Sequence, residues 1–413
     1  MSSQTICILG GGIGGLVAAN ELRRLLPKYH RIVLVDRVEQ HAFAPSFLWV
    51  MTGDRQSDRI TRPIKSLLRP GVEFVHANVS AIDTERSRVE MEKGSLSYDY
   101  LVVAVGAELS PESVPGLHEA AHTFYTLNGA SRLHGTLREF HAGRIAVVIA
   151  STPYKCPGAP LEGAMLIADY VRRNGRRERV AIDLYTPEPQ PMPVAGPVLG
   201  NAVLNMLKSR SIEYHPLHKL VSVDPQKRQV TFEGKGSVEY DLLVAIPPHR
   251  SPSFVRQSNL ANESGWLPVD RATLATKIGN IYAVGDVTAI SIPGRWKSGV
   301  PLALPKAGVF AHVQASVVAH RIAAAIMDHV ATESFCGDGY CMLEAGEDLA
   351  GFAYGNFFAE PSPDVKLKRI GKAWHVGKLL FEKWWLAPYG PRRALYKSLI
   401  NLGSRFLGIP SNI

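Results

Sequence analysis

Short apolar runs separated by amphipathic segments recur along the chain. The runs at residues 5–9 and 144–150 have the length and continuous apolar character of strands buried on both faces, and a helix-like pattern follows each. This alternation predicts an α/β protein built on parallel sheets. No run reaches the roughly eighteen uninterrupted apolar residues of a membrane span, so we expect no transmembrane helix. The chain enters its first strand without a signal-peptide pattern, so we also expect no secretory signal.

A glycine motif follows the first predicted strand. Gly10, Gly12 and Gly15 are spaced as G-x-G-x-x-G ahead of a helical segment, and the next apolar run ends on Asp36. Glycines at these places allow a tight turn and close approach of the backbone to a pyrophosphate at a helix N-terminus. The acid can bind ribose hydroxyls. The order strand, glycines, helix, strand, acid therefore predicts a dinucleotide-binding site.

Two later strands complete the expected nucleotide domain. Residues 98–107 form an apolar run that contains Gly106 near its end, and residues 280–290 form another that leads into Gly285 and Asp286. Together with the glycine motif, these pieces resemble the flavoproteins with two dinucleotide-binding domains, whose discontinuous FAD domain closes with a Gly-Asp strand end. The resemblance implies that FAD binds here and that Asp286 contacts its ribityl and pyrophosphate region.

The second α/β unit lacks the glycine loop expected after its first strand. Residues 151–162 read STPYKCPGAPLE, in which Gly158 is the only glycine. The three prolines of this stretch have no N–H to offer a phosphate. We therefore expect a degenerate nicotinamide-nucleotide site and a reductant other than NADH.

The cysteines indicate site chemistry rather than a disulfide scaffold. Four cysteines in 413 residues are too few for such a scaffold, and none has the CxxC spacing of a zinc site, so no metal is expected. Cys156 lies at a strand-to-helix junction beside Lys155, where the helix dipole and the lysine are expected to lower its pKa and favour the thiolate. Cys336 and Cys341 follow the last FAD segment and are both candidates for a partner thiol. Cys7 is expected inside a buried strand.

The cysteine motif carries a more specific resemblance. Residues 155–160 read Lys-Cys-Pro-Gly-Ala-Pro, with Glu162 six residues after the cysteine. This stretch is similar to the sulfide:quinone oxidoreductases and to the related flavoprotein subunit of flavocytochrome c sulfide dehydrogenase. The resemblance implies sulfide as substrate, a pair of redox cysteines bridged at rest, FAD as cofactor and membrane quinone as electron acceptor. The implied product is polysulfide or sulfur.

The resemblance also assigns roles to individual residues. It makes Cys156 and Cys341 the redox pair, with Cys336 as the weaker alternative to Cys341. Glu162 would handle the protons of sulfide or of a persulfide, although an acid in the first turn of a helix is stabilising in any case. Lys306 would contact FAD and face the flavin, where a cation stabilises the anionic reduced form.

The chain departs from this family's pattern at two places. Where many members have a third cysteine followed four residues later by a histidine, this sequence has Tyr125 and Gly129. Neither this linker nor residues 41–50 contains a cysteine for covalent attachment of the flavin. We therefore expect a two-cysteine mechanism with noncovalently bound FAD.

The positive charge is concentrated in the C-terminal tail. The whole chain has a net charge of +9, and the residues from Lys366 onward hold ten basic residues against the single acid Glu382. The rest of the chain therefore sums to zero. No nucleic-acid-binding module accompanies this charge, and the basic residues alternate with leucine and tryptophan, so we expect no nucleic-acid partner.

The tail has the pattern of an interfacial helix. Residues 391–408 place basic residues beside one apolar stripe, and the pair Trp384 and Trp385 precedes them. The stripe consists of Leu395, Leu399, Leu402 and Phe406. We expect this helix and the tryptophans to lie on an anionic membrane surface. The alternative is an ordinary amphipathic helix packed on the protein's own core or on a partner subunit.

These patterns together predict two Rossmann-like dinucleotide-binding domains and a C-terminal membrane-interface region. We place the FAD-binding domain at residues 1–110 and 251–330, the second Rossmann-like domain with its degenerate NAD site at 111–250, and the region for quinone and membrane contact at 331–413. The expected protein is a peripheral, monotopic enzyme of the cell membrane, compatible with a homo-oligomer. Three alternatives stay open: a sulfide dehydrogenase flavoprotein that delivers electrons to cytochrome c, a type II NADH:quinone oxidoreductase, and a redox-inactive FAD-binding adaptor.

Overall fold

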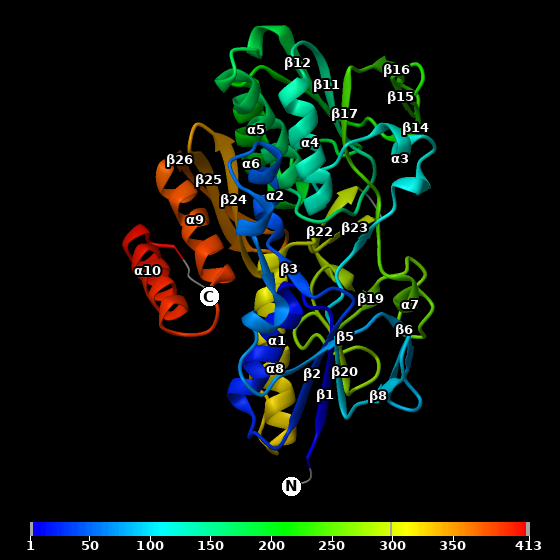
Figure 1. Cartoon of the computed structure of the whole chain (residues 1–413), viewed down its shortest axis with the longest axis vertical. Coiled ribbons are helices and arrows are strands. Elements are labelled where there is room, and N and C mark those ends of the chain that lie inside the picture. Colours follow the sequence, from blue (N-terminus) through cyan, green and yellow to red (C-terminus); the bar gives the residue numbers. More distant parts are fainter. Residues whose placement is uncertain (1–2, 298–299, 410–413) are drawn as a thin grey trace.

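Two parallel sheets form the two lobes of the molecule in a computed structural model that describes residues 3–297 and 300–409 (Figure 1). The lower sheet has the strand order β20-β9-β1-β2-β5, and all its neighbouring strands pair in parallel. Its strands are β1 (Thr5–Leu9), β2 (Arg31–Asp36), β5 (Glu73–His76), β9 (Tyr100–Val103) and β20 (Ile281–Ala283). The sheet thus joins the N-terminal segment to a strand from the far part of the chain, as the glycine and Gly-Asp motifs predict.

Both faces of this lower sheet are covered. Helix α1 (Ile13–Leu25) packs on one face and against α8 (Gly308–Ile326). The other face packs its buried side chains, Cys7 among them, against the small antiparallel sheet of β6 (Val79–Asp83), β7 (Arg88–Met91) and β8 (Ser95–Ser97). Parallel strands buried on two faces need continuous apolar runs, which is the pattern the sequence shows.

Helix α8 is the one helix among the described residues that is long and apolar enough to cross a membrane. Its buried residues include Phe310, Val318 and Ile322, and it packs along α1. More than half of its apolar window, 56%, is buried inside the protein. We therefore assign α8 to the core of the lower lobe.

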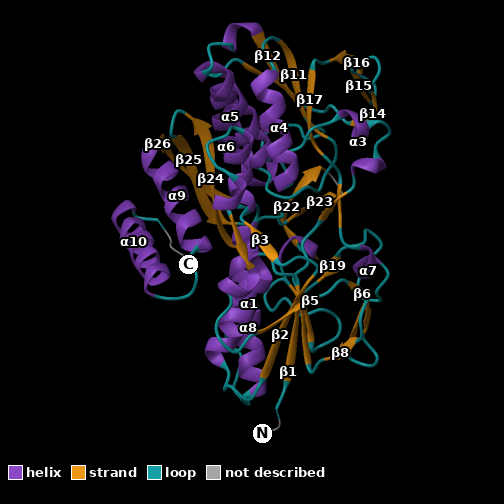
Figure 2. Ribbon diagram, viewed as in Figure 1, coloured by secondary structure: helices purple, strands orange, loops and turns teal. Residues whose placement is uncertain are grey.

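The upper lobe is built on the second parallel sheet, with the order β13-β12-β11-β17 (Figure 2). Its strands are β11 (Gly143–Ile149), β12 (Val180–Tyr185), β13 (Ile212–His215) and β17 (Leu242–Ile246). The helices of this lobe are α4 (Leu127–Glu139), α5 (Ala159–Arg173) and α6 (Gly196–Lys208). Helix α5 begins directly after the cysteine motif, so the fold of this lobe positions Cys156.

A third sheet and two helices follow α8 along the flank of the molecule (Figure 1). The antiparallel strands β24 (Asp338–Gly346), β25 (Leu349–Asn356) and β26 (Asp364–Gly371) form the sheet. β24 packs against α5, and α9 (Lys372–Leu386) packs against β25. Helix α10 (Pro391–Leu407) packs on α9. This arrangement brings the tail of the chain next to the cysteine motif.

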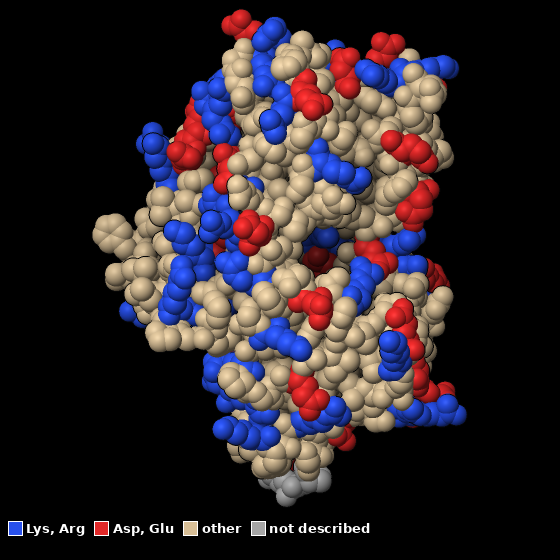
Figure 3. Space-filling model, viewed as in Figure 1, with Lys and Arg blue, Asp and Glu red and all other residues tan. Residues whose placement is uncertain are grey.

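The remaining elements are short connections. The strands are β3 (Gln40–Ala42), β4 (Thr61–Pro63), β10 (Glu108–Leu109), β14 (Leu220–Asp224), β15 (Gln229–Phe232), β16 (Gly236–Glu239), β18 (His249–Arg250), β19 (Leu267–Pro268), β21 (Thr288–Ala289), β22 (Ser291–Lys297) and β23 (Val300–Ala303). The helices are α2 (Phe47–Met51), α3 (Leu117–Ala120) and α7 (Ser253–Arg256). The surface is hollowed where the two lobes meet, with charged side chains of both signs at the floor (Figure 3).

Candidate functional site

The glycine loop after β1 has the geometry of a phosphate cradle. Gly10 has φ +99°, and a Cβ added to Gly15 would lie 1.8 Å from the carbonyl oxygen of Gly10, so neither position tolerates a side chain. A Cβ added to Gly12 would meet nothing within 4 Å, which leaves open space at the start of α1. Asp36, at the end of β2, accepts a hydrogen bond from the N–H of Gly11. These residues fit a bound dinucleotide.

The Gly-Asp turn after β20 supplies the other half of this cradle. Gly285 has φ +76°, and its N–H donates to Gln314 Oε1 at 2.7 Å. The carboxyl oxygen Oδ1 of Asp286 is buried and has no hydrogen-bond partner among the described residues. Burial raises the pKa of this carboxyl, and Lys306 and Lys155 lower it in part. An unpartnered buried oxygen beside a tight turn fits the hydroxyl groups of a cofactor chain such as the ribityl of FAD.

Gly106 and His249 lie beside the same cradle. Gly106 follows β9 with φ +66°, and an added Cβ would meet nothing within 4 Å. His249 donates from Nδ1 to the carbonyl of Pro247 at 2.8 Å, and its buried Nε2 has no partner among the described residues. Burial, followed by the charge of Lys155, lowers the pKa of His249 to about 3, so this imidazole is neutral at physiological pH.

Lys306 links the cradle to the cysteine motif. Its Nζ donates to the carbonyls of Asp286 at 2.6 Å and Thr288 at 3.2 Å, and it lies 3.5 Å from the centre of the Trp266 ring. Burial lowers the pKa of Lys306 to about 8. The carbonyl of Lys306 accepts the backbone N–H of Cys156 at 2.6 Å. The structure therefore places the predicted cation and the predicted redox cysteine on two paired segments.

Cys156 and Cys341 lie together, and Cys336 does not join them. Cys156 has φ +54°, a left-handed conformation that is uncommon for a residue with a side chain and is often found at functional sites. The Sγ of Cys341, on β24, lies 3.4 Å from the position of a Cβ added to Gly158. Cys336 is exposed ahead of β24 and donates from Sγ to the carbonyl of Ser334 at 3.6 Å. The geometry favours Cys341 over Cys336 as the partner of Cys156.

The expected low pKa of Cys156 is wrong. Burial and, next, the carboxylate of Glu162 raise the pKa of this thiol to about 12. The main opposing contributions come from the charge of Lys378 and from a hydrogen bond with the backbone at Ala159. Burial, with Glu162 and Cys156, also raises the pKa of Cys341 well above its usual value. Both thiols are therefore stabilised in the protonated form, because a buried charge next to a carboxylate is costly.

Glu162 is half of a buried ion pair that the sequence does not reveal. Its Oε1 accepts from Nζ of Lys378 at 2.5 Å and from the backbone N–H of Glu344 at 2.9 Å. Both side chains of the pair are almost fully buried. Burial lowers the pKa of Lys378, and the two carboxylates of Glu162 and Glu344 raise it more, so the ammonium is retained. A lysine in a basic tail gives no sequence signal of this burial.

Tyr154 lies at the carboxyl edge of the second parallel sheet. It comes from the loop after β11, and its hydroxyl donates to Glu188 Oε2 at 2.7 Å. Glu188 follows β12, and both side chains are buried. Burial raises the pKa of Glu188 to about 7, although hydrogen bonds from Tyr154 and Thr186 lower it in part. Ligands of open α/β sheets bind at this carboxyl edge of the strands, and here Tyr154 and Glu188 lie there.

The tryptophans of the tail are not on the surface, which corrects the expectation for them. Trp384 and Trp385 are buried in the main core with Leu386. The apolar stripe of α10 is exposed as expected, with exposed fractions of 57% for Leu395, 42% for Leu399, 66% for Leu402 and 90% for Phe406. Lys and Arg side chains gather on the same flank of the molecule (Figure 3). The interfacial character of the tail therefore rests on α10 alone.

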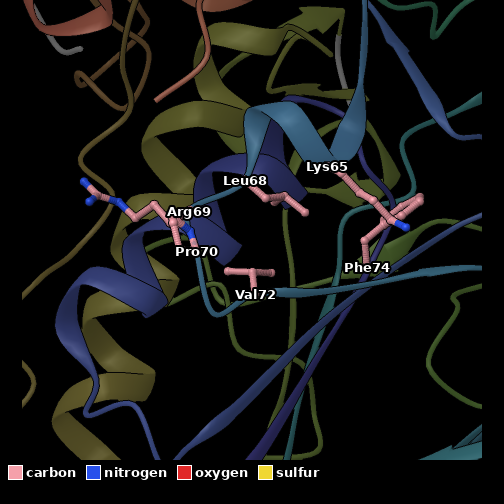
Figure 4. Close-up of a pocket in the computed structure, with 6 residues that line it drawn as sticks. All are labelled: Lys65, Leu68, Arg69, Pro70, Val72 and Phe74. Carbon is pink, nitrogen blue, oxygen red and sulfur yellow. The ribbon is translucent and has the colours of Figure 1, made fainter. Parts of the chain in front are cut away.

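A surface pocket lies away from these residues. It has a volume of about 310 Å³ and is lined by Lys65, Leu68, Arg69, Pro70, Val72 and Phe74 (Figure 4). Lys65 and Arg69 lie at opposite ends of it. Arg69 stacks its guanidinium on the ring of Tyr389 at 4.7 Å. The pocket holds none of the predicted site residues. Among the described residues there is also no cluster of three or more side chains suited to a metal ion.

Comparison with known proteins places this site in a family context. The family described as pyridine nucleotide-disulphide oxidoreductase matches residues 4–317. The mitochondrial sulfide:quinone oxidoreductase of Mus musculus is 27% identical over 68% of this chain and 65% of its own length, so this chain spans about two thirds of that relative. The sulfide-quinone reductase of Aquifex aeolicus is 28% identical over 93% of this chain and 90% of its own.

A solved structure shares the fold over nearly the whole chain. The sulfide:quinone oxidoreductase from the hyperthermophilic bacterium Aquifex aeolicus superposes with a TM-score of 0.86 and 24% sequence identity. The match covers 99% of this chain and 96% of that one. The predicted fold class, two Rossmann-like units followed by a C-terminal region, is confirmed by this likeness.

Proposed function

The chain belongs to the pyridine nucleotide-disulphide oxidoreductase family, and we propose that it oxidises sulfide to polysulfide or sulfur and passes the electrons to quinone. The similarity to the mouse and Aquifex proteins supports this activity. The observation that carries the proposal is the contact of Cys341 with the Cys156 motif, across Gly158 and beside the buried Glu162. Two thiols held together next to a dinucleotide cradle form a redox pair that needs no nicotinamide cofactor.

The cofactor of this family is FAD, and the cradle residues fit it. When bound, FAD supplies a two-electron acceptor between the cysteine pair and quinone. The residues that would hold it are Gly10, Gly12, Gly15, Asp36, Gly106, Gly285, Asp286 and Lys306. Among these, the buried ammonium of Lys306 is placed to stabilise negative charge that develops nearby.

The cysteine pair carries the sulfur chemistry of the proposal. In the oxidised protein Cys156 and Cys341 share a disulfide, and HS⁻ attacks one of the two sulfurs. A sulfur–sulfur bond to the substrate forms, the protein disulfide breaks, and one cysteine becomes a persulfide while the other leaves as a thiolate. The positive charge of Lys378 lowers the pKa of both thiols and so stabilises that thiolate. Glu162 accepts the proton of the bound HS⁻, because its charge raises the pKa of both thiols more than that of any other residue does.

The second α/β unit supports sulfide rather than NADH as the reductant. The Tyr154 hydroxyl and the Glu188 carboxyl, joined at 2.7 Å, occupy the edge where the adenosine ribose of NADH would bind. The loop before α5 has no glycine cradle, and its prolines offer no N–H groups. A type II NADH:quinone oxidoreductase would need an open ribose site at this edge and a glycine-rich loop before α5.

Helix α10 supports quinone in a membrane as the acceptor. Its four exposed apolar side chains form the face opposite the one packed on α9, and basic residues flank them. We assign this face to the surface of an anionic membrane, which makes the protein peripheral and monotopic. Because quinone resides in the bilayer, the enzyme needs such a contact to reach it.

Anaerobic mixing with sulfide tests the proposed function. Sulfide is expected to bleach the flavin absorbance of the wild-type holoenzyme, and NADH is expected to leave it unchanged. Cys156→Ser and Cys341→Ser should abolish bleaching by sulfide, whereas Cys336→Ser should bleach at the wild-type rate. Bleaching by NADH without bleaching by sulfide would contradict the proposal. If Cys336→Ser abolished bleaching by sulfide and Cys341→Ser retained it, Cys336 would replace Cys341 as the partner of Cys156.

A further inference from the structure

The buried ion pair beside the cysteines continues as a chain of titratable groups that reaches solvent. Oε2 of Glu344, on β24, and Nδ1 of His375 lie within hydrogen-bond distance, 2.8 Å apart. Nε2 of the same imidazole lies 3.7 Å from Asp348 Oδ1 in the turn after β24. The exposed fraction of the side chains rises along this line from 2% for Glu344 through 16% for His375 to 77% for Asp348. The chain therefore leads from the buried cluster to the surface.

The inner end of this chain is joined to Glu162 by two contacts. The backbone N–H of Glu344 donates to Glu162 Oε1 at 2.9 Å, and Lys378 donates to the same oxygen at 2.5 Å. The ammonium of Lys378 also acts on the Glu344 carboxylate. Oxygen Oε1 of Glu344 is buried and accepts no hydrogen bond from any described residue. That oxygen is free to take a proton, since its carboxylate uses only Oε2 toward His375.

We propose that Glu344 and His375 form the exit through which the proton released at the cysteine pair leaves the buried cluster for solvent. This inference rests on the proposed oxidation of sulfide. Conversion of one HS⁻ to sulfur at the level of a persulfide sulfur gives up one proton and two electrons. Glu162 receives the proton from the sulfur, and the electron pair leaves toward the cofactor. Without an exit the proton would stay on Glu162 and cancel the charge that retains Lys378.

The hand-over along the chain keeps every charge balanced. The ammonium of Lys378 first gives a proton to Glu344 and then takes the proton held by Glu162, so the ammonium is regenerated. Protonated Glu344 gives its proton to Nδ1 of the His375 tautomer that carries hydrogen on Nε2, and the Nε2 hydrogen is then released to water beside Asp348. Glu344 and Asp348 face His375, and from α2 the ring of Trp49 packs edge-on at 5.9 Å. The two facing carboxylates stabilise the imidazolium while it holds the proton.

These residues lie apart from the quinone and cofactor contacts proposed above. His375 and Lys378 are one turn apart on α9, and Glu344 lies three residues after Cys341 on β24. The protons consumed in reducing quinone would be taken up elsewhere, so the two proton movements are separate. In this role Glu344 and His375 act through Glu162 and are positioning and relay residues. They do not touch the reacting sulfur.

A single-turnover experiment on the holoenzyme tests the exit. The oxidised enzyme is mixed anaerobically with sulfide in weak buffer, and flavin absorbance and a pH-indicator dye are followed together. His375→Gln and Glu344→Gln keep hydrogen-bonding capacity and are expected to slow proton release about tenfold. This effect is smaller than the ~10²–10⁴-fold contribution of direct acid–base catalysis, because neither residue touches the reacting sulfur. His375→Ala should regain speed when free imidazole is added. The matched control is His329→Gln, at an exposed histidine after α8, which should behave as wild type.

The outcomes separate failure of the exit from failure of the proposed function. If sulfide does not bleach the wild-type flavin, the proposed function fails before the exit is in question. If sulfide bleaches wild type and both Gln variants release the proton at the wild-type rate, the exit is overturned. For Gln variants that do not fold, His375→Ala decides. Proton release at the wild-type rate, or slow release that free imidazole does not speed up, would overturn the proposal.

Discussion

Trp385 on α9 donates a hydrogen bond from its indole N–H to Nε2 of His41 at 2.8 Å. The other ring nitrogen of His41 lies 3.0 Å from the carbonyl oxygen of Gly11. Because a carbonyl only accepts, His41 carries its proton on Nδ1 and is neutral, and burial lowers its pKa. Helix α9 and the glycine loop of the lower lobe are therefore joined through one imidazole.

Replacing this tryptophan should weaken cofactor retention. Trp385→Phe leaves Nε2 of His41 buried without a donor, which costs about 1–3 kcal/mol. We expect a lower thermal midpoint and a larger loss of FAD during gel filtration. Trp384→Phe is the matched control, because the indole N–H of Trp384 has no hydrogen-bond partner in the described parts of the chain. Equal FAD loss in both variants would show that the hydrogen bond to His41 is not what matters.

The Glu162–Lys378 pair makes a prediction about stability. Lys378→Met leaves a carboxylate buried and uncompensated, and should lower the free energy of unfolding by about 3–5 kcal/mol. The double variant Glu162→Gln, Lys378→Met removes both charges and should recover most of that stability while sulfide oxidation stays impaired. Lys383→Met, at an exposed lysine of the same helix, is the control. Thermal unfolding of the holoproteins measures both effects, and a double variant as unstable as Lys378→Met would contradict the assignment.

Removing the charge of Glu162 should activate the reduced thiols. Burial and then Glu162 raise the pKa of Cys156 to about 12, so the wild-type thiol should react with iodoacetamide only slowly near neutral pH and faster as pH rises. Glu162→Gln takes away the carboxylate and frees Lys378 to stabilise the thiolate. The alkylation rate at pH 8 should therefore increase, and the midpoint of its pH profile should fall. A profile that does not move would show that Glu162 does not act on this thiol.

The acid in the second lobe predicts a pH-dependent stability. The pKa of Glu188 is raised by burial from 4.5 to about 7, so the folded protein binds a proton there that the unfolded chain loses above pH 4.5. The stabilisation is therefore complete below pH 4.5 and is lost as pH rises to about 7, with a size of about 3 kcal/mol. Glu188→Gln should flatten this part of the thermal stability profile. If the thermal stability of wild type and of Glu188→Gln changes by the same amount between pH 5 and pH 7, the prediction is wrong.

The apolar face of α10 should control membrane binding. Leu402→Asp with Phe406→Asp places two charges on side chains that are 66% and 90% exposed, so folding should be unaffected. Each large apolar side chain contributes about 1.5–3 kcal/mol when buried, so binding to vesicles of anionic phospholipid should fall by about 10²-fold or more. Val330→Asp makes the same kind of change at an 87% exposed valine outside α10 and is the control. Unchanged co-sedimentation of the double variant would remove the membrane assignment.

The nucleotide-binding residues of the lower lobe could be predicted in detail because each of their motifs is a short stretch of sequence. The glycine spacing, the acid at Asp36 and the Gly285-Asp286 strand end each depend on a few adjacent residues, and the structure brings them to one sheet edge. Cys156 could be located for the same reason, since it follows a strand and precedes a helix. The choice of Cys341 rested on a resemblance, and the contact across Gly158 gives it a geometric basis.

The contacts between distant segments could not be predicted. Lys378, Glu344 and His375 become a buried cluster only because α9 folds back over β24 and β25, and their sequence pattern is that of a solvated basic tail. The same fold-back buries the tryptophan pair, whose composition suggests a membrane interface. The pKa of Cys156 was predicted with the wrong sign because a neighbouring lysine in sequence counts for less than burial beside a carboxylate.

The hydroxyl of Tyr154, set against Glu188, has a consequence for the cell's supply of electrons. A nucleotide site that is blocked by the chain's own side chains cannot be opened by raising the concentration of NADH. We therefore expect sulfide oxidation by this protein to be independent of the ratio of NADH to NAD⁺. Nicotinamide-nucleotide analogues that inhibit relatives with an open nucleotide site should not inhibit this enzyme.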